Sequence, residues 1–472
     1  MGLTRLGRFT LTLAVLALLG YWVYTHPEIL ERLRTPRVPA PTPQAAPFPA
    51  PAPPGPQVTT APPPQVPGGL SARERGRVQY QAGDYAGAIA SLGRAITANP
   101  FDVESLTLRE NAFTLLPGKP VWRIAVAGPF TGPDKQCGQQ VLFGVYYAQR
   151  QANQAGGLRG RKVVVNFYDD QAAAEEAVRV AQTIAADPEV LAVVGHCNSR
   201  ATLAAGPLYE SEGIPVITAT STNPDIAQLG DFIFRVVGND NDQARALANA
   251  LWSENRRTVV VFVDQEDAYS RGLSDNFQRR FARLGGRVII NPFTIGGEII
   301  VSTDLREADA ILVTGEYADA GKIARLVRDL GISAPIVGGD AVYSQGLFAF
   351  GGEAARGVRA TAFYHYTVRD SPLLPRAEEF ARRFAAVIHA PPNHNMATAY
   401  DAASLILNAI REAGAQRQAI RAYLASIGRT RPAYVGVTGK IAFDADGEAV
   451  GKPWVLVRAR ERDFVADTVI AP

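Results

Sequence analysis

Short apolar runs alternate with longer amphipathic stretches from Val121 almost to the end of the chain. The runs have the length of strands, and the stretches between them repeat with the period of a helix. Continuous apolar strands joined by helices are typical of parallel sheets that are covered on both faces. About 350 residues of this pattern exceed one doubly wound sheet, so we expect an α/β fold of two lobes. The predicted strands are residues 123–127, 162–168, 191–194, 215–217, 258–263, 287–290, 310–313 and 335–337, and the predicted helices include 142–154, 174–186 and 270–284.

Residues 191–223 predict two polar turns at one edge of such a sheet. Asn198 and Ser199 follow the first strand and stand where a helix N-cap belongs. A hydroxyl-rich turn, residues 218–222, follows the next strand. In α/β proteins the edge at the carboxyl ends of the strands binds ligands, and helix N-termini there suit an anion such as a carboxylate. Helix capping alone would explain any single Ser or Thr, but two such turns in one unit favour a binding site.

Composition excludes several classes of protein. The chain has 472 residues, of which 47% are hydrophobic, so two or three domains can each bury a core. A formal net charge of +3 without a long basic run argues against nucleic acid as a partner. Two cysteines, Cys137 and Cys197, exclude a disulfide scaffold and a cysteine-rich zinc cluster, although one bridge between them stays open.

The sequence carries no recognisable catalytic motif. It lacks a Gly-x-Ser-x-Gly elbow and a Walker-type phosphate loop, and its five histidines show no paired spacing for a metal. His196 and Cys197 are neighbours at a strand end, where adjacent side chains point in opposite directions, so we do not expect them to form a catalytic dyad. We therefore expect a binding protein without enzymatic activity, cofactor or metal.

The N-terminal residues are predicted to lie outside the folded part of the chain. Arg5 and Arg8 precede an apolar run over residues 9–24, which is typical of a signal anchor (residues 1–26) with the rest of the chain beyond the membrane. Cleavage as a signal peptide is the alternative. Residues 36–67 contain fourteen of the 33 prolines, so we expect residues 27–69 to form a disordered, extended linker.

A helical pattern spans residues 70–117. Gly83, Tyr85, Ala88, Leu92 and the terminating Pro100 resemble one tetratricopeptide repeat, and a partial second repeat follows. About three repeats are usually needed to bury the faces of such units. We therefore expect this segment to dock on the following domain or on another chain rather than to bind peptides independently.

Residues from about 121 to 472 resemble the type I periplasmic-binding-protein fold and, within it, the branched-chain amino acid binding proteins of ABC importers. The resemblance rests on the order and spacing of several short motifs. They are IAVAGP (124–129) with TGP (131–133), NQAGGL (153–158) with Gly160, YDD (168–170), VGH (194–196), YESEGIP (209–215), TNP (222–224) and GGD (338–340). The resemblance implies two lobes joined by three hinge strands, the first over about 121–238 and 364–435 and the second over about 239–363 and 436–472.

In that family the two lobes close over an amino acid by a hinge motion. By resemblance, Ser199 would bind the ligand carboxylate, Thr222 would add its hydroxyl and N–H, and the backbone around Thr220 would contact both ends of the ligand. Asp340 matches the acidic residue that meets the ammonium group, and Tyr269 matches the aromatic that covers the ligand on closure. Neutral donors would grip the carboxylate without desolvating a counter-charge.

Several departures from the family pattern bear on specificity. Cys137 stands where relatives often place an aromatic wall, and Cys197 lies beside the carboxylate turn; a bridge and two buried thiols are both open. Glu316 and Tyr317 fall where the family presents an aromatic, and Glu316 adds a second negative charge. Residues 296–309 are too short for a full crossover helix. The ligand stays open between leucine, a cationic or more polar amino acid and a small amide. The full predicted ligand-binding set is Ser199, Thr220, Ser221, Thr222, Tyr269, Asp340, Cys137, Asn198, Glu316 and Tyr317.

The resemblance implies a solute-binding protein that feeds an ABC permease. With the N-terminal apolar run, we expect it to be anchored in the inner membrane with its main domains in the periplasm. The alternative is a sensory or scaffold protein that uses the same fold to regulate a membrane or cell-wall partner. Neighbouring permease and ATPase genes would favour the first function, and an adjacent kinase or synthase gene would favour the second.

Overall fold

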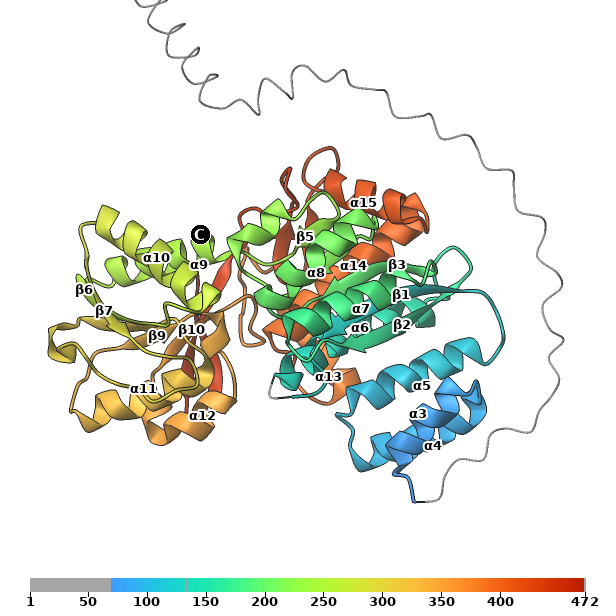
Figure 1. Cartoon of the computed structure of the whole chain (residues 1–472), viewed down its shortest axis with the longest axis horizontal. Helices are drawn as coiled ribbons and strands as arrows, with labels where there is room; N and C mark the ends of the chain where they lie inside the picture. Colours follow the sequence, from blue (N-terminus) through green and yellow to red (C-terminus); the bar gives the residue numbers. More distant parts are fainter. Residues whose placement is uncertain (1–68, 133, 471–472) are drawn as a thin grey trace, which may run out of the picture. The chain divides into compact units, whose positions relative to one another are not determined.

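A computed structural model describes residues 69–132 and 134–470 (Figure 1). The predicted signal anchor and almost all of the proline-rich linker lie outside these residues. None of the helices in this part of the chain is both long enough and apolar enough to span a bilayer. The described part begins with three helices, α3 (Ala72–Gln81), α4 (Tyr85–Ala98) and α5 (Val103–Leu115), and continues into two lobes that are each built on a sheet.

Side-chain caps and a small core define the three helices. A capping box of Ser71 and Glu74 starts α3. Asp84 and Asp102 are simple N-caps of α4 and α5, each accepting a hydrogen bond from a backbone N–H of the first turn. Leu92 and the alanines around it are fully buried between the helices. The helices thus form within the predicted segment, while its likeness to a tetratricopeptide repeat stays a prediction.

The helix α5 packs against the first lobe through a buried asparagine. Asn111 Nδ2 donates to the Val165 carbonyl at 2.7 Å, and Asn111 Oδ1 accepts from the Val165 N–H at 3.0 Å. Val165 belongs to β2 (Lys162–Asp169), the edge strand of the sheet in this lobe. Gln149 of α6 (Lys135–Gln154) also donates to Asn111 Oδ1, at 2.7 Å. The asparagine amide therefore takes the place of a neighbouring strand, and α5 covers the sheet edge.

A second asparagine continues this pattern two residues along the strand. Asn153, at the end of α6, accepts from the Val163 N–H at 2.7 Å and donates to the Val163 carbonyl at 3.0 Å. Its amide also donates to Glu110 and Thr114 of α5. Side chains from two helices thus satisfy the edge of β2, and the helical segment docks on the domain that follows it.

Replacing Asn111 by alanine is expected to lower the free energy of unfolding by about 2–4 kcal/mol, because the N–H and C=O of Val165 lose their partners in a buried place. Urea-induced unfolding followed by circular dichroism measures the change. Asn276→Ala is the matched control, since this amide bonds Gly272 and Arg279 of its own helix, α10 (Ala268–Arg283). The control should shift stability by less than about 0.5 kcal/mol. Equal effects of the two variants would contradict the edge-covering role of α5.

Lobe 1 is built on a five-stranded parallel sheet in the order β2-β1-β3-β4-β5. Every residue of its central strand is buried, as predicted for a strand covered on both faces. The strand order reverses between β1 and β3, and ligands bind at such switch points in open α/β sheets. The remaining strands are β1 (Val121–Gly128), β3 (Val190–Gly195), β4 (Val216–Thr218) and β5 (Ile233–Arg235), and the covering helices are α6, α7 (Ala174–Ala185), α8 (Ser199–Ser211), α14 (His394–Ala413) and α15 (Arg417–Ser426). Helix α13 (Ala377–Ile388) packs on α6 and α14.

Lobe 2 contains a seven-stranded sheet in the order β14-β13-β10-β9-β8-β6-β7. Its first five strands along the chain pair in parallel, and the last two add antiparallel at one edge. The connection between β7 and β8 contains the 3-10 turn η2 (Leu305–Glu307) in place of a full helix, as its length predicted. The strands are β6 (Thr258–Val263), β7 (Arg287–Pro292), β8 (Ala310–Val313), β9 (Ile336–Gly338), β10 (Arg359–Ala362), β13 (Trp454–Arg460) and β14 (Asp463–Ile470), and the helices are α9 (Asp240–Ser253), α10, α11 (Tyr317–Asp329) and α12 (Gly346–Gly351).

Within the described residues the chain crosses between the lobes after β5, after β10 and before β13. The last crossing comes later than the predicted boundary at residue 436. The hairpin of β11 (Tyr434–Gly436) and β12 (Gly439–Ile441) is followed by a turn that stays against lobe 1. There the Arg235 N–H of β5 donates to the Gly447 carbonyl at 3.0 Å, and the Arg235 guanidinium pairs with Glu448. The chain therefore enters lobe 2 for the last time just before β13.

Candidate ligand-binding site

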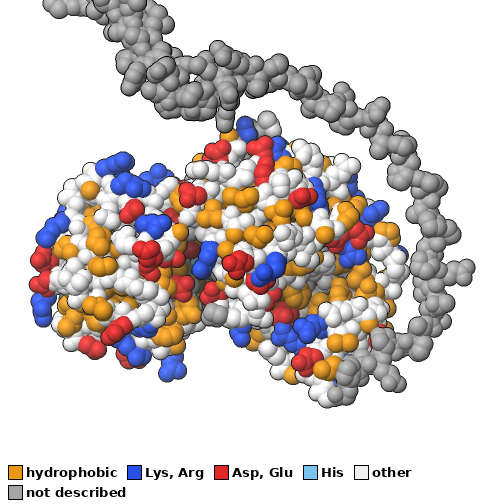
Figure 2. Space-filling model, viewed as in Figure 1, with side chains coloured by type: hydrophobic (Ala, Val, Ile, Leu, Met, Phe, Trp, Pro, Cys, Tyr) orange, Lys and Arg blue, Asp and Glu red, His pale blue; other side chains and the backbone are white. Residues whose placement is uncertain are grey.

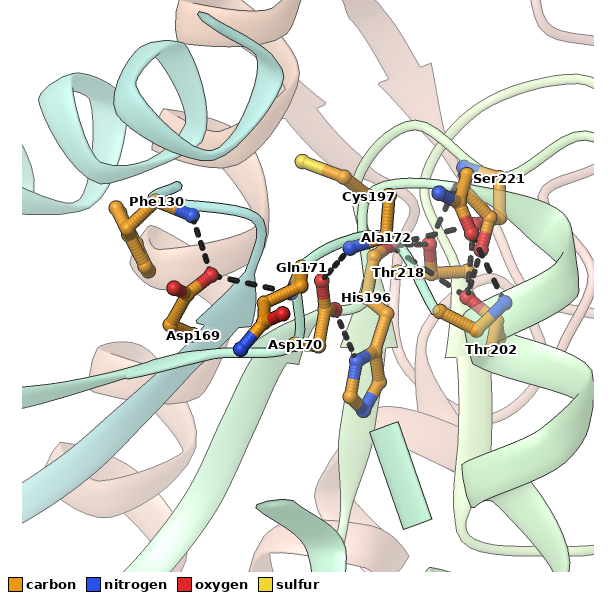
Figure 3. Close-up of polar contacts among 12 residues, drawn as sticks. Phe130, Asp169, Asp170, Gln171, Ala172, His196, Cys197, Thr202, Thr218 and Ser221 are labelled. Atoms are coloured by element: carbon orange, nitrogen blue, oxygen red, sulfur yellow. Dashed lines mark hydrogen bonds and ion pairs between the residues drawn. The ribbon is translucent and has the colours of Figure 1, made fainter. Parts of the chain in front are cut away.

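The two predicted polar turns follow β3 and β4 of lobe 1, and buried side chains hold the first turn in place. His196 follows β3, and its Nδ1 lies 2.6 Å from Asp170 Oδ2 while its Nε2 lies 3.1 Å from the Tyr209 hydroxyl. All three side chains are almost inaccessible to solvent. The His196 and Cys197 side chains point in opposite directions, as predicted (Figure 3). The buried histidine thus supports the turn from beneath.

The His196 carbonyl ties the second turn to the first (Figure 3). It accepts from Ser221 Oγ at 3.2 Å, and Ser221 Oγ also lies 2.8 Å from Thr202 Oγ1 of α8. The Thr220 hydroxyl donates to the Cys197 carbonyl at 2.5 Å. The hydroxyls of Thr220 and Ser221 are therefore engaged within the turns. The buried Ser221 side chain positions the turn, and its contact with a ligand stays a prediction.

Ser199 joins the two turns at the start of α8. The preceding residue, Asn198, is the N-cap, and its side chain accepts from the Ala201 N–H at 2.9 Å, so Asn198 has a structural role. Ser199 Oγ accepts from the N–H groups of Thr222 at 3.3 Å and Asn223 at 3.2 Å. Among the described residues no acceptor takes the Ser199 hydroxyl hydrogen. This O–H group, at a helix N-terminus, is arranged to donate to a carboxylate.

The two cysteines lie beside this turn as free thiols. Cys197 is buried, and Cys137 on the first turn of α6 is partly exposed. Burial, and then the neighbouring Cys137, raise the pKa of the Cys197 thiol well above its usual range. Gly138 lets α6 approach closely, because an added Cβ would lie 1.9 Å from the Pro129 carbonyl oxygen. A disulfide and two free thiols were both open from the sequence, and the structure has two free thiols.

Asp340 follows β9 in lobe 2 and lies at the centre of a polar cluster. Asp340 Oδ1 accepts from Gln243 Nε2 at 2.6 Å and from the Tyr269 hydroxyl at 3.2 Å. Gly339 makes room for this contact, because an added Cβ would lie 2.1 Å from the Tyr269 hydroxyl. Desolvation raises the pKa of Asp340 above its usual range, and desolvation together with the Asp340 charge raises the pKa of Tyr269. Asp340 and Tyr269, both predicted, are thus in direct contact.

The first turn of α9 adds two residues that sequence reasoning missed. Gln243 bridges Asp340 and the Thr361 hydroxyl, the latter at 2.8 Å. Asp240 is fully buried, and neither of its carboxylate oxygens has a hydrogen-bond partner in the described part of the chain. Burial, and then the Asp340 charge, raise the pKa of Asp240 to about 7. The sequence around Asp240 indicated only a boundary between the lobes, over residues 238–242, and gave no sign of a binding site.

The same helix brings the two halves of the site together. The Asp240 N–H donates to the Thr222 carbonyl of the second turn at 2.9 Å. One turn further along α9, Gln243 reaches Asp340 in lobe 2. Helix α9 therefore places the hydroxyl and N–H donors of lobe 1 beside the acidic cluster of lobe 2.

Glu316 and Tyr317 have different surroundings at the start of α11. The Glu316 side chain is exposed, and the face drawn in Figure 2 is hollowed between the two lobes, with charged side chains along the hollow. Partial desolvation, and then the Asp134 charge of lobe 1, raise the pKa of Glu316 to about 7. Tyr317 instead packs on α12, where an added Cβ on Gly346 would lie 2.3 Å from its ring. Tyr317 is partly exposed, and desolvation, and then the charges of Glu316 and of Asp134 in lobe 1, raise its pKa, so its contact with a ligand stays a prediction.

Comparisons with known proteins agree with this architecture. A family model described as periplasmic binding protein matches residues 121–463. The leucine-, isoleucine-, valine-, threonine- and alanine-binding protein of Pseudomonas aeruginosa is 28% identical over 340 residues, which are 69% of this chain and 86% of that protein. The crystal structure of a leucine-binding protein from Thermotoga maritima is 30% identical and matches with a TM-score of 0.66, over 75% of this chain and 99% of the other. The branched-chain amino acid transporter substrate-binding protein of Streptococcus pneumoniae, solved with isoleucine, gives a TM-score of 0.68 at 26% identity, over 75% of this chain and 100% of the other.

These matches confirm the predicted fold class of two parallel-sheet lobes. The family match begins at Val121, after α5, so the three N-terminal helices are additional to it.

Proposed function

Because the chain belongs to the periplasmic binding protein family, we propose that it captures an amino acid between its lobes outside the cytoplasm and delivers it to the permease of an ABC importer. The proposal rests on the Ser199 hydroxyl. Its oxygen accepts hydrogen bonds from two backbone N–H groups of the second turn, and no acceptor among the described residues takes its hydrogen, which can therefore bind a ligand. Related proteins named for leucine, isoleucine and valine support an amino acid as the ligand class.

The carboxylate of the amino acid would bind at the start of α8. Ser199 supplies an O–H donor, and Thr222 supplies a hydroxyl at the edge of the second turn. The α8 N-terminus adds a partial positive charge of about half an elementary charge. All of these donors are neutral, so a carboxylate can enter without a buried counter-ion having to be desolvated.

The ammonium group would bind beside the first turn of α9, in the acidic cluster. Asp340 keeps partial exposure while it accepts from Gln243 and Tyr269, so an oxygen lone pair remains for a cation. Asp240 adds a carboxylate that has no hydrogen-bond partner in the described residues. The donors belong to lobe 1 and Asp340 to lobe 2, so a bound amino acid would hold the lobes closed.

Replacing Ser199 by alanine should weaken amino-acid binding by about 10- to 100-fold, because a hydrogen bond to a charged group is worth about 1.5–3 kcal/mol. Isothermal titration calorimetry of the full chain in mild detergent, against amino acids and their amides, measures the loss. Ser211→Ala at the far end of α8 is the matched control, since its hydroxyl bonds the Leu208 carbonyl. That variant should bind as the unaltered chain does.

Either of two results would contradict the proposal. One is equal affinity of the Ser199 and Ser211 variants for the ligand. The other is a folded chain that binds no amino acid or amide, which would favour the sensory or scaffold alternative.

The proposal includes a membrane tether at the N-terminus, and its support is the apolar run over residues 9–24 behind Arg5 and Arg8. Alkaline extraction of membranes should then leave the chain in the membrane pellet. Release into the soluble fraction would contradict an uncleaved anchor.

A further inference from the structure

Within the described residues, the three segments that connect the lobes meet in one buried hydrophobic cluster. Val237 follows β5, Phe363 follows β10 and Trp454 begins β13, so each crossing of the chain contributes one residue. The rings of Phe363 and Trp454 lie 4.9 Å apart. A rotation of one lobe against the other must turn about this cluster, so side chains that pack on it are placed to control closure.

His394, the first residue of α14, brings lobe 1 to this cluster. Its ring stacks on Phe363, with the centroids 5.4 Å apart and the planes at 20°. The Tyr343 ring of lobe 2 meets the same imidazole edge to face, at 4.7 Å and 79°. Tyr343 is the C-cap of the 3-10 turn η3 (Asp340–Val342), and its N–H donates to the Asp340 carbonyl at 3.1 Å. A contact between the lobes therefore lies one short turn away from the acid proposed to bind the ammonium group.

The two rings of this contact are fixed to different lobes. On the side of lobe 2, Tyr343 packs edge to face against Phe464 of β14 at 4.9 Å. On the side of lobe 1, the residue after His394 is Asn395, whose amide donates to Gln140 of α6 at 2.8 Å. When the lobes separate, Tyr343 moves with β14 and His394 moves with α6, so the contact between them opens.

His394 is a buried polar residue whose ring makes no hydrogen bond within the described part of the chain. Phenylalanine would offer the same stacking surface without a polar atom to desolvate. Buried polar groups are normally paired, so an unpaired one calls for an explanation other than packing. Histidine adds to an aromatic ring the ability to take up a proton close to neutral pH.

The surroundings of His394 oppose that proton while the lobes are closed. The titratable side chains beside it are Tyr343 and His365, which are not anions near neutral pH. Desolvation, and then the His365 charge, lower the pKa of His394 to about 3. Desolvation likewise lowers the pKa of His365 to about 4, against the opposing charge of Asp463.

The acids on η3, β14 and α14 have partners other than His394. Asp340 and Asp463 each accept a hydrogen bond from a tyrosine hydroxyl, at 3.2 Å and 2.7 Å. On α14 itself, the charge of Asp401 is opposed by that of Lys452. Pairs with arginine hold the other two, Asp467 of β14 and Glu412 of α14. A proton on the closed His394 ring is therefore a buried charge without a partner, which is strongly unfavourable.

We propose that His394 is a positioning residue for lobe closure, whose neutral ring holds lobe 1 against Tyr343 of lobe 2 and whose protonation opens the lobes and releases the ligand. This inference rests on the proposed function and adds its regulation by pH. Acidification outside the cytoplasm would then empty the site, and a return to neutral pH would restore capture.

The direction of the effect follows from proton linkage. Once separated from Tyr343, the His394 ring is open to water, and its pKa returns toward the usual value of about 6.5. The open state then binds more protons than the closed state between about pH 3 and pH 6.5, so closure weakens as the pH falls. The closing constant should drop by up to about 25-fold between pH 7 and pH 5.

Hydrogen–deuterium exchange of the full chain in mild detergent, without added ligand, tests the opening itself. Peptides that cover residues 340–348 and 393–398 report on the two sides of the contact. After correction for the intrinsic pH dependence of amide exchange, both should exchange faster at pH 5 than at pH 7. Peptides from β6, whose last five residues are buried, should keep their protection.

His394→Phe should remove the response, because its ring can stack but cannot take up a proton. Exchange of both segments should then be the same at pH 5 and pH 7. His394→Gln removes the charge with a smaller side chain, so the question is answered even if the larger ring disturbs the fold. His389→Asn is the matched control, since His389 is exposed at the end of α13, where its φ of 61° suits asparagine. This control should respond as the unaltered chain does.

Calorimetric titration with leucine measures the consequence for binding. Between pH 7 and pH 5 the affinity should fall by up to about 25-fold more in the unaltered chain than in the His394→Phe variant. Asp240, whose pKa is raised to about 7 by burial, contributes equally to both chains and cancels in this comparison.

Two outcomes would overturn this inference and leave the proposed function standing. One is equally slow exchange at both pH values in the unaltered chain, and the other is a response that survives His394→Phe and His394→Gln. Absence of binding by every amino acid would instead overturn the proposed function, and the exchange measurement would still decide whether His394 controls closure.

Discussion

Replacing Asp401 by alanine should lower the free energy of unfolding at neutral pH by about 3–5 kcal/mol, because the ammonium group of Lys452 stays buried without its charge partner. Asp401 of α14 accepts from the N–H groups of Val437 and Thr438, both at 2.9 Å. Lys452 Nζ donates to the Thr438 carbonyl at 2.6 Å and to the Thr438 hydroxyl at 2.9 Å. Both charged side chains are at most 1% exposed, so water cannot replace the lost partner.

The Asp401 variant also has a pH signature. Burial lowers the pKa of Lys452 to about 8, against the opposing charge of Asp401. Without that charge the pKa of the folded state falls further, while the unfolded chain keeps a lysine pKa of about 10.4. The folded variant then sheds the buried proton at a lower pH than the unaltered protein does, and its stability recovers as the pH rises. The deficit should therefore be larger at pH 6 than at pH 9.

Urea-induced unfolding at the two pH values measures both effects. Glu379→Ala is the control, because the pair of Glu379 with Arg383 on α13 is exposed and should contribute less than about 0.5 kcal/mol. A deficit that is the same at pH 6 and pH 9 would show that Lys452 does not carry the cost.

A single methyl group on Gly144 is the second substitution with a large expected effect. An added Cβ would lie 2.2 Å from the Met396 carbonyl oxygen and 2.8 Å from the Tyr400 backbone nitrogen, both in α14. No side-chain rotation can relieve an overlap with backbone atoms, so α6 and α14 must move apart. Gly144→Ala should therefore lower the free energy of unfolding by about 3 kcal/mol.

The control for Gly144 is the same chemical change elsewhere. Gly272 lies inside α10, and an added Cβ there meets no atom within 4 Å. Gly272→Ala should raise stability by about 0.5–1 kcal/mol, because alanine is the better helix former. Thermal and urea unfolding of both variants should thus give shifts of opposite sign. Shifts of the same sign would contradict the close approach of α6 and α14.

The elements that could be predicted were those whose hydrophobic pattern is visible within a short stretch of sequence. The buried runs gave the core strands, and β6 and β8 begin and end at the predicted residues, 258–263 and 310–313. Helix α6 begins at Lys135, earlier than the predicted residue 142, because its first residues are polar and mask the helical period. The short strand β5 and the antiparallel pair β13 and β14 were missed, since three-residue strands carry little signal and edge pairing depends on distant segments.

The residues of the site also divide into those with a signal in the sequence and those without one. Ser199 was predicted from a polar turn at a strand end, where the fold class itself directs attention, and Asp340 and Tyr269 were predicted from the resemblance to the family. Asp240 was missed because an acidic residue at a helix start is usually a cap, and Gln243 was missed because its partner Asp340 is 97 residues away. The contacts that Ser221 makes with the His196 carbonyl and Tyr317 with Phe350 could not be predicted, because tertiary packing decides which way a polar or aromatic side chain points.

The position of α5 in the chain has a consequence for synthesis. Helix α5 precedes β1 and β2, so the ribosome delivers the cover of the sheet edge before the edge itself. In the folded chain Asn111 bonds β2 on the side away from β1, so the N–H and C=O of Val165 are not presented to another chain. A truncated chain that starts at Val121, where the family match starts, would lose this protection and should aggregate during expression.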